Sequence, residues 1–323
     1  MGETLRVPAA GSTTSGQVDG VAPDVLAVPP TADAVTMLVA VVAVSTSGPL
    51  MASTIAPALA IAFWRNAMSA SLLAPWALWR HRAELRLVRR ELPAVSIGAG
   101  LLLALHFGTW VPSLTFTSVA SATALVSTQP IWAALLARRN GAQISSHAWM
   151  GIGVAVCGAV VITGVDVSTS ARALAGDGLA LAGGVFAAGY MTAGGAVRQR
   201  VGTVTYTAVC YTTTAVVLVL ACAIGGKALA GYPAGAWWRL VAVTAGAQFL
   251  GHSLFNRVLR TVSPTMVSMA ILFEVPGAAL IAAIWLHQTP HAAAIPGLAL
   301  LVGGVGLVLM ARNRAVAPSV PVE

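Results

Sequence analysis

Glu274 is the residue whose type and surroundings best suit chemistry. It lies near the middle of the apolar stretch 265–286, TMVSMAILFEVPGAALIAAIWL, two residues before Pro276. A carboxylate in apolar surroundings costs free energy unless a partner, a ligand or a proton neutralises it. The proline removes one helical hydrogen bond and leaves a carbonyl oxygen nearby without its partner. We expect Glu274 to be the only one of the ten acidic residues inside a strongly apolar segment, and it indicates a polar binding site.

Arg65 is the expected partner of Glu274 or of a substrate carboxylate. It lies about eight residues into the apolar segment 57–79, and Glu274 lies about twelve residues from the corresponding end of its own segment. The two depths differ by roughly 6 Å at 1.5 Å per residue, which two long side chains can span if their helices adjoin. Alternatively, Arg65 extends beside Trp64 toward the end of its segment. Glu274 could likewise make only a structural hydrogen bond to a neighbouring helix.

Other polar and aromatic residues inside apolar segments are candidates for lining the same site. They are His106, Gln129, Trp110, His252, Tyr211 and Tyr190, and helix breaks for gating are expected at Pro49, Gly48, Pro130, Pro276 and Gly194. The two histidines mark two vestibules, or each only donates a hydrogen bond to a neighbouring helix. Gln129 suits either a substrate contact or a contact between helices. The aromatic residues, glycines and prolines equally suit ordinary packing.

Metal and cofactor chemistry is not indicated. Cys157, Cys210 and Cys222 have no metal-ligand spacing, and we expect no disulfide among them. The sequence has no HExxH, no GxSxG and no phosphate-binding glycine loop. We therefore expect no metal, no cofactor and no enzymatic activity. An intramembrane enzyme or a membrane receptor with a polar site around Glu274 is the alternative.

The composition predicts an all-α integral membrane protein. Of the 323 residues, 57% are hydrophobic and only 9% are charged, whereas soluble domains carry about 25% charged residues. Residues 1–34 lack the apolar core of a signal peptide and are expected to form a disordered cytoplasmic tail, with a second tail at 312–323. Ten segments are apolar and long enough to cross a bilayer as helices. They are 35–53, 57–79, 93–112, 117–137, 147–165, 176–197, 204–224, 237–257, 265–286 and 291–311.

The basic residues predict the orientation of these segments. Of the 18 lysines and arginines, 14 fall in the tails and in alternate loops. They are Arg6, Arg80, Arg82, Arg86, Arg89, Arg90, Arg138, Arg139, Arg198, Arg200, Arg257, Arg260, Arg312 and Arg314. The positive-inside rule then places both termini in the cytoplasm. The net charge of +8 therefore reflects topology, and we expect no nucleic-acid partner.

An internal repeat recurs at an offset of 146 residues. It aligns Pro130 with Pro276, and the further pairs are Gly151 with Gly297, Gly158 with Gly304, Gly100 with Gly246, Gly48 with Gly194, and His106 with His252. This register superposes the first five segments on the last five. Because five is an odd number, the halves 35–165 and 176–311 must insert with opposite orientation. Inverted repeats of this kind place a substrate site near the bilayer midplane.

Residues 35–311 resemble the drug/metabolite transporter superfamily, specifically its EamA-domain branch. The resemblance rests on FWRNAMSA around Arg65 and on VPSLTFTSVASATALVSTQPIWAALL, GDGLALAGGVFAAGYMTAGGAVRQR and SPTMVSMAILFEVPGAALIAAIWL. It implies a multi-pass transporter with two EamA-like five-helix repeats, working by alternating access in the cell (cytoplasmic) membrane. It also implies a small-molecule substrate such as an amino acid or a toxic, drug-like compound, with export as the expected direction. Proton coupling and a homodimer are further expectations.

Overall fold

The computed structural model describes residues 30–139, 141, 143–258, 262, 267 and 270–314. Its regular elements in this part of the chain are helices, without strands. Most of the two expected tails lies outside the described residues. The first helix begins at Thr31, so the last four residues of the expected N-terminal tail are helical.

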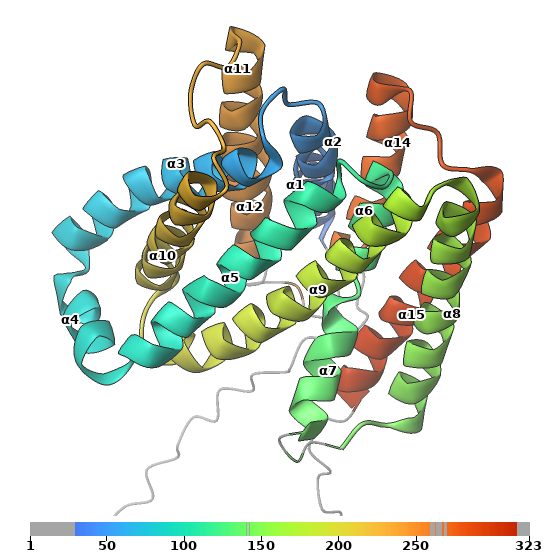
Figure 1. Ribbon diagram of the computed structural model, residues 1–323. Coiled ribbons are helices and arrows are strands. Elements are labelled where there is room, and N and C mark those ends of the chain that lie inside the picture. Colours follow the sequence, from blue (N-terminus) through green and yellow to red (C-terminus); the bar gives the residue numbers. More distant parts are fainter. Residues whose placement is uncertain are drawn as a thin grey trace, which may run out of the picture.

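The first half of the chain contributes eight helices of very different length. They are α1 (Thr31–Ser45), α2 (Ser47–Ala52), α3 (Ala58–Arg80), α4 (Arg82–Glu91), α5 (Pro93–Ser113), α6 (Val119–Val126), α7 (Gln129–Arg139) and α8 (Ser146–Thr169). The second half is described by α9 (Ala171–Arg198), α10 (Thr203–Ile224), α11 (Ala234–Val243), the π-helix η1 (Thr244–Gly251) and α12 (His252–Val258). It continues with α14 (Glu274–Leu286), the 3₁₀ turn η2 (Ala292–Ala294) and α15 (Ile295–Arg314). Figure 1 shows these helices as one bundle.

Seven stretches in the described part of the chain are long and apolar enough to cross a membrane. They cover the expected segments one, three to seven and ten, with α1–α2 and α6–α7 each counted as one stretch. The other three expected segments correspond to α3, to α11–η1–α12 and to α14, and these do not meet the same criteria. The structure therefore supports an all-helical membrane protein but not the count of ten spanning helices.

Two of the expected segments are interrupted at matching points of the repeat. The first half breaks at 127–128, where α6 ends and α7 begins at Gln129, directly before Pro130. The second half turns at 272–273, and α14 begins at Glu274, two residues before Pro276. A proline is tolerated in the first turn of a helix, where its missing N–H would have no partner anyway. Each proline therefore lies just inside a new helix rather than at a kink in a continuous one.

The break in α1–α2 has no counterpart in the second half. One helix ends at Ser45 and the next begins at Ser47, and Gly48 and Pro49 lie in the short α2. Gly194, the repeat mate of Gly48, lies within the continuous helix α9. The expected break at Gly194 is therefore wrong. A side chain there would overlap the Tyr206 ring, so this glycine permits close packing of α10 on α9.

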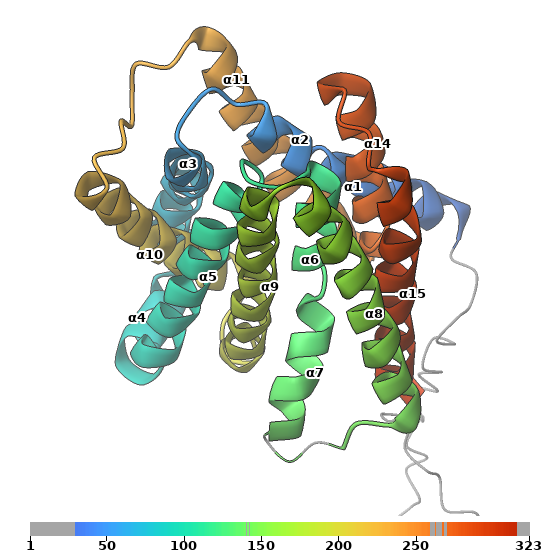
Figure 2. The ribbon, with the colours of Figure 1, turned by 45° about the vertical axis from the view of Figure 1, so that its right-hand side comes forward.

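The equivalent helices α8 and α15 pack against each other in opposite directions. A Cβ at Gly151 would lie 2.8 Å from the Gly304 carbonyl oxygen, and a Cβ at Gly297 would lie 2.9 Å from the Gly158 carbonyl oxygen. The contact between Gly151 and Gly304 thus mirrors the contact between Gly158 and Gly297. Because the residue numbers run oppositely along the two helices, the pair is antiparallel, and Figure 2 shows the two helices side by side.

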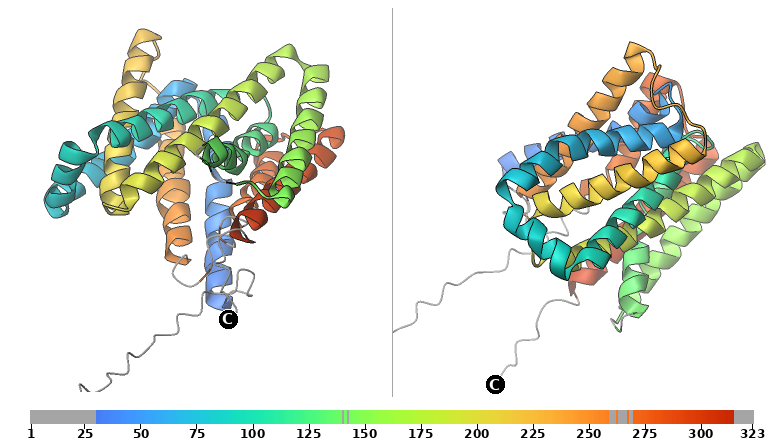
Figure 3. Two further views of the ribbon diagram at one scale, coloured as in Figure 1. Left: turned by 90° about the horizontal axis from the view of Figure 1, so that it is seen from below. Right: turned by 60° about the vertical axis from the view of Figure 1, so that its left-hand side comes forward.

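The short helix α4 joins the two halves at one end of the bundle. Its Glu84 carboxylate accepts hydrogen bonds from Thr205 Oγ1 at 2.5 Å, from the Gly202 backbone N–H at 2.9 Å and from His81 at 3.3 Å. Glu91 forms an ion pair with Arg200. We call these contacts of α4 with the α9–α10 connection and the start of α10 the α4 clamp. Figure 3 shows α4 at the turn between α3 and α5, beside the α9–α10 connection.

Candidate functional site

Arg65 is buried in the interior of the bundle. Its side chain is 3% exposed, and its Nε donates to Gln248 Oε1 at 3.0 Å. Gln248 in turn donates from Nε2 to Ser69 Oγ at 2.6 Å, and Ser69 donates to the Arg65 carbonyl oxygen at 2.8 Å. These contacts link α3 to η1 and hold the guanidinium in one position. The alternative in which Arg65 extends to the end of its segment is therefore wrong.

The remaining contacts of the Arg65 guanidinium are weaker. Its Nη1 lies 3.4 Å from Ser47 Oγ and 3.5 Å from Met51 Sδ, both in α2. The Phe107 ring lies 4.5 Å from the guanidinium carbon, in the range of a cation–π contact. This side of the guanidinium can still bind a carboxylate or another acceptor more strongly than its present partners do.

Glu274 and Arg65 form no ion pair in this conformation. The ion pairs in the part of the chain that the structure describes are His81 with Glu84 and Arg200 with Glu91. The Glu274 carboxyl nevertheless lies within electrostatic range of the guanidinium, and the Tyr211 hydroxyl lies in the same region. The expected direct pairing is therefore absent, and the two groups act on each other only at longer range.

Glu274 lies at the first residue of α14 and is half-buried. Helix α14 packs against α1, α2 and α6, so the interrupted segments of both halves meet around it. The start of a helix carries a partial positive charge, which favours a carboxylate there. The carboxyl group is thus held where the helix begins, within the interior of the bundle.

His106 and Trp110 form a wall on α5 beside the Arg65 guanidinium. The two rings stack with their centroids 5.6 Å apart, and Phe107 lies next to both. His106 Nδ1 lies 2.9 Å from the Gly183 carbonyl oxygen of α9. Because a carbonyl only accepts, Nδ1 carries the hydrogen and Nε2 of the neutral ring remains an acceptor. Trp110 is 6% exposed, and its Nε1–H has no hydrogen-bond partner among the described residues.

Tyr190 and Tyr211 occupy different surroundings. Tyr211 on α10 is half-buried and faces the region of Arg65 and Gln248. Tyr190 on α9 stacks on Tyr206 with centroids 5.7 Å apart, and the Tyr206 hydroxyl donates to the Tyr190 carbonyl oxygen. We call the hydrogen-bonded group Arg65, Gln248 and Ser69 the Arg65 network. Tyr211 therefore lies beside the Arg65 network, whereas Tyr190 belongs to the packing of α9 on α10.

Two further candidates, Gln129 and His252, are placed by the helices that they begin. Gln129 is the first residue of α7 and is half-buried beside Pro130. His252 begins α12, and its side chain lies outside the described residues. The structure thus places Gln129 at the α6–α7 break without assigning it a contact to the Arg65 network.

Two important residues were missed by sequence reasoning. Gln248 is the one polar side chain in the stretch 245–251, AGAQFLG, a signal like that of Gln129. It also lies in a π-helix, a feature frequent at functional sites. Asp177 in α9 is 1% exposed. The expectation that Glu274 is the only embedded acid is therefore wrong. Asp177 adjoins Gly176, which packs on Phe116 and Thr117 at the α5–α6 connection.

Comparisons with known proteins agree with this arrangement. The sequence model of the EamA-like transporter family matches residues 33–164 and 174–310. Fourteen solved chains match the structure. One of these crystal structures has a TM-score of 0.60 and 19% sequence identity, with 87% of this chain and 99% of that chain covered, which shows a shared fold. No curated protein matches the chain.

The first matched region contains the break before Pro130 and the second contains the break before Pro276. Together the two regions hold Arg65, Gln248, Glu274 and the stacked rings of His106 and Trp110. They include most of the described helices and leave only the ends of the chain and residues 165–173 unmatched. This chain therefore belongs to the EamA-like transporter family, within the drug/metabolite transporter superfamily.

Proposed function

We propose that this protein is a secondary transporter that exports small amphiphilic metabolites, such as amino acids or toxic drug-like compounds, across the cytoplasmic membrane. The observation that carries the proposal is the buried Arg65 guanidinium, held by Gln248 and facing Phe107, with Glu274 near it but in no ion pair among the described residues. A buried cation of this kind is retained for an anionic partner. The partner that fits is the carboxylate or another anionic group of a substrate.

The groups around Arg65 suit an amphiphilic molecule. The rings of His106, Phe107 and Trp110 offer apolar and aromatic surface. The Trp110 Nε1–H, which no described residue accepts from, offers one donor. Glu274 supplies the group that exchanges a proton during transport. Binding of the substrate's anionic group to Arg65 and of a proton to Glu274 would each remove one uncompensated charge from the interior.

Alternating access is supported by the symmetry of the two halves. Helices α8 and α15 are repeat mates that run antiparallel, as opposite insertion of two five-segment halves (35–165 and 176–311) requires. Helix α14, which begins at the break before Pro276, packs against α6, which ends at the break before Pro130. Interrupted helices of this kind provide backbone groups for a ligand. With the arginine-rich loops inside, both termini are cytoplasmic, and a C-terminal tag should resist protease added to the outside of intact cells.

The test is uptake into proteoliposomes of a pooled metabolite panel, with and without an imposed proton gradient. The wild type is compared with Glu274→Gln, and Glu3→Gln serves as the control because it removes a carboxylate outside the apolar segments. We expect gradient-driven accumulation of one compound class that Glu274→Gln abolishes and Glu3→Gln retains. Accumulation that ignores both the gradient and Glu274→Gln would overturn proton coupling while retaining transport.

The same protein samples distinguish a transporter from the alternative, an intramembrane enzyme or receptor. A transporter needs two compartments, whereas an enzyme converts substrate in detergent without any gradient. Conversion of a panel compound by the purified protein in detergent, without accumulation in proteoliposomes, would replace the transporter proposal.

A further inference from the structure

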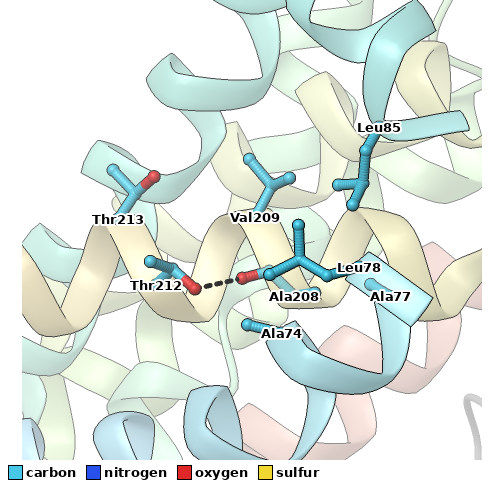
Figure 4. Close-up of a pocket in the computed structure, with 8 residues that line it drawn as sticks. All are labelled: Ala74, Ala77, Leu78, Leu85, Ala208, Val209, Thr212 and Thr213. Atoms are coloured by element: carbon cyan, nitrogen blue, oxygen red, sulfur yellow. Dashed lines mark hydrogen bonds between the residues drawn. The ribbon is translucent and has the colours of Figure 1, made fainter. Parts of the chain in front are cut away.

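An apolar groove lies between α3, α4 and α10, away from the Arg65 network. It has a volume of about 250 Å³. Figure 4 shows Ala74, Ala77 and Leu78 of α3 on one side, Val209 and Thr213 of α10 on the other, and Leu85 of α4 at one end. The Thr212 hydroxyl donates a hydrogen bond to the Ala208 carbonyl oxygen at 2.7 Å. Its hydrogen is therefore not available to a molecule in the groove, whose lining is otherwise mostly apolar. Its small alanines leave a channel where larger side chains would fill the space.

The groove opens toward the surroundings of the bundle. Helices α3, α4 and α10 form one edge of the molecule in Figures 1 and 2. On the two helices that form its sides, Leu72 of α3 is 64% exposed, Leu78 of α3 60% and Leu220 of α10 56%. Trp76 and Trp79 at the end of α3 are also exposed, as expected for residues at a membrane–water interface. An apolar face of this kind in a membrane protein contacts lipid acyl chains.

Helix α4 places a row of positive charge at the end of the groove. At 100° per residue, Arg82, Arg86, Arg89 and Arg90 share one face, and all four are exposed. Glu84 and Glu91 lie on the opposite face, where the α4 clamp engages them. In the part of the chain that the structure describes, the arginine row has no ion-pair partner. Leu85, which lines the groove, lies next to this row on the helix surface.

We propose that this groove and the arginine row of α4 form a binding site for one anionic phospholipid. One acyl chain lies in the groove between α3 and α10, and the phosphate contacts Arg86 and Arg89 at its end. Guanidinium groups match phosphate oxygens in geometry and charge. The charge complementarity selects an anionic headgroup, and the apolar groove selects a chain rather than a free phosphate. This proposal requires only that the protein is inserted in a membrane. It does not depend on the identity of the transported substrate.

The test measures lipid binding to the purified full-length protein in detergent. Native mass spectrometry counts retained lipids, and the shift in thermal unfolding gives apparent affinity for phosphatidylglycerol and for phosphatidylcholine with the same acyl chains. We expect phosphatidylglycerol to be retained and to raise the unfolding temperature more than phosphatidylcholine does. Equal effects of the two lipids would overturn the anionic site, and so would an equal effect of inorganic phosphate alone.

Two pairs of variants separate the headgroup contact from the groove. Arg86→Gln/Arg89→Gln should weaken phosphatidylglycerol binding about ten- to thirtyfold, since each arginine near the surface contributes about 1 kcal/mol. Arg138→Gln/Arg139→Gln removes equal charge from the end of α7 and should retain binding.

Ala74→Phe fills the groove and should reduce retained lipid, whereas Leu72→Phe changes an exposed residue outside it and should not. Equal behaviour within either pair, in variants that unfold cooperatively, would overturn the proposal.

Discussion

At the residue scale, the buried guanidinium of Arg65 is costly unless its donors find acceptors. The Arg65 Nε–H donates a hydrogen bond to Gln248. Nη1 has only a 3.4 Å contact to Ser47 and a 3.5 Å contact to Met51. Sulfur is a weak acceptor, so these contacts compensate little of the desolvation of a charge. The arrangement holds the cation in place and leaves part of its binding capacity for another group.

Arg65→Lys tests whether this geometry or only the charge matters. Lysine keeps the charge but lacks the planar set of five donors, so it cannot bind Gln248 and a second acceptor together in the same way. We expect transport of the substrate found in the panel to fall about tenfold or more, because a hydrogen bond to a charged group contributes about 1.5–3 kcal/mol. Initial uptake rates over a concentration series measure this, with the exposed Arg139→Lys as control. Wild-type rates in Arg65→Lys would assign Arg65 a purely electrostatic role.

At the element scale, glycines set the distance between α8 and α15. Gly151, Gly158, Gly297 and Gly304 lie where the backbone of one helix meets the backbone of the other. A side chain at any of them would push the two helices apart. Gly153 lies on the same helix α8 but faces open space, because a Cβ there would have no neighbouring atom within 4 Å. The same glycine-to-alanine change at Gly158 and at Gly153 therefore compares a position at the helix contact with one that faces open space.

Gly158→Ala should destabilise the protein, and Gly153→Ala should not. A Cβ at Gly158 would lie 2.6 Å from the Gly297 carbonyl oxygen, so the helices must separate, at a cost of about 1–3 kcal/mol for overpacking. Alanine at the open position gains helix propensity of up to about 1 kcal/mol. Thermal unfolding in detergent measures both. Equal unfolding temperatures for the two variants would show that α8 and α15 do not approach this closely.

At the scale of the whole molecule, the α4 clamp connects the two halves at the expected cytoplasmic end. Glu84 comes from the connection between α3 and α5, and its donors Gly202 and Thr205 come from the start of α10. Hydrogen bonds lower the pKa of the Glu84 carboxyl, chiefly the bond from Thr205, helped by those from Gly202 and His81. The ionised carboxylate is thus the form that the folded protein stabilises.

The sign of the resulting pH dependence follows from that lowered pKa. Stability contributed by Glu84 is fully present above the ordinary pKa of a glutamate and is lost as the pH falls through the lower pKa of the folded protein. We expect Glu84→Gln to unfold at a lower temperature than wild type at pH 7, and the difference to shrink below about pH 4. Thermal unfolding from pH 7 to pH 3 measures this, with Glu3→Gln, a change outside the apolar segments, as the control. A difference that stays constant over this range would contradict the clamp.

The sequence alone allowed much of this architecture to be predicted. The apolar segments predicted helices at the observed places, because spanning length and apolar composition are local properties of the chain. The 146-residue repeat aligned Pro130 with Pro276 and the glycines of α8 with those of α15, and the structure shows matching breaks and reciprocal contacts there. Arg65 stands out in the sequence as a charge inside an apolar segment, and its side chain is buried in the structure.

Only the tertiary structure decided which groups meet. The partner of Arg65 is Gln248 rather than Glu274, because contacts between helices depend on their rotation and tilt, which spacing along one segment does not fix. Asp177 is buried although it lies at the edge of its apolar segment, because burial there depends on how α9 packs on its neighbours. Helix α9 continues through Gly194 although the sequence predicted a break there. Tertiary packing decides whether a glycine ends a helix or lets another helix approach, and here it lets α10 approach α9.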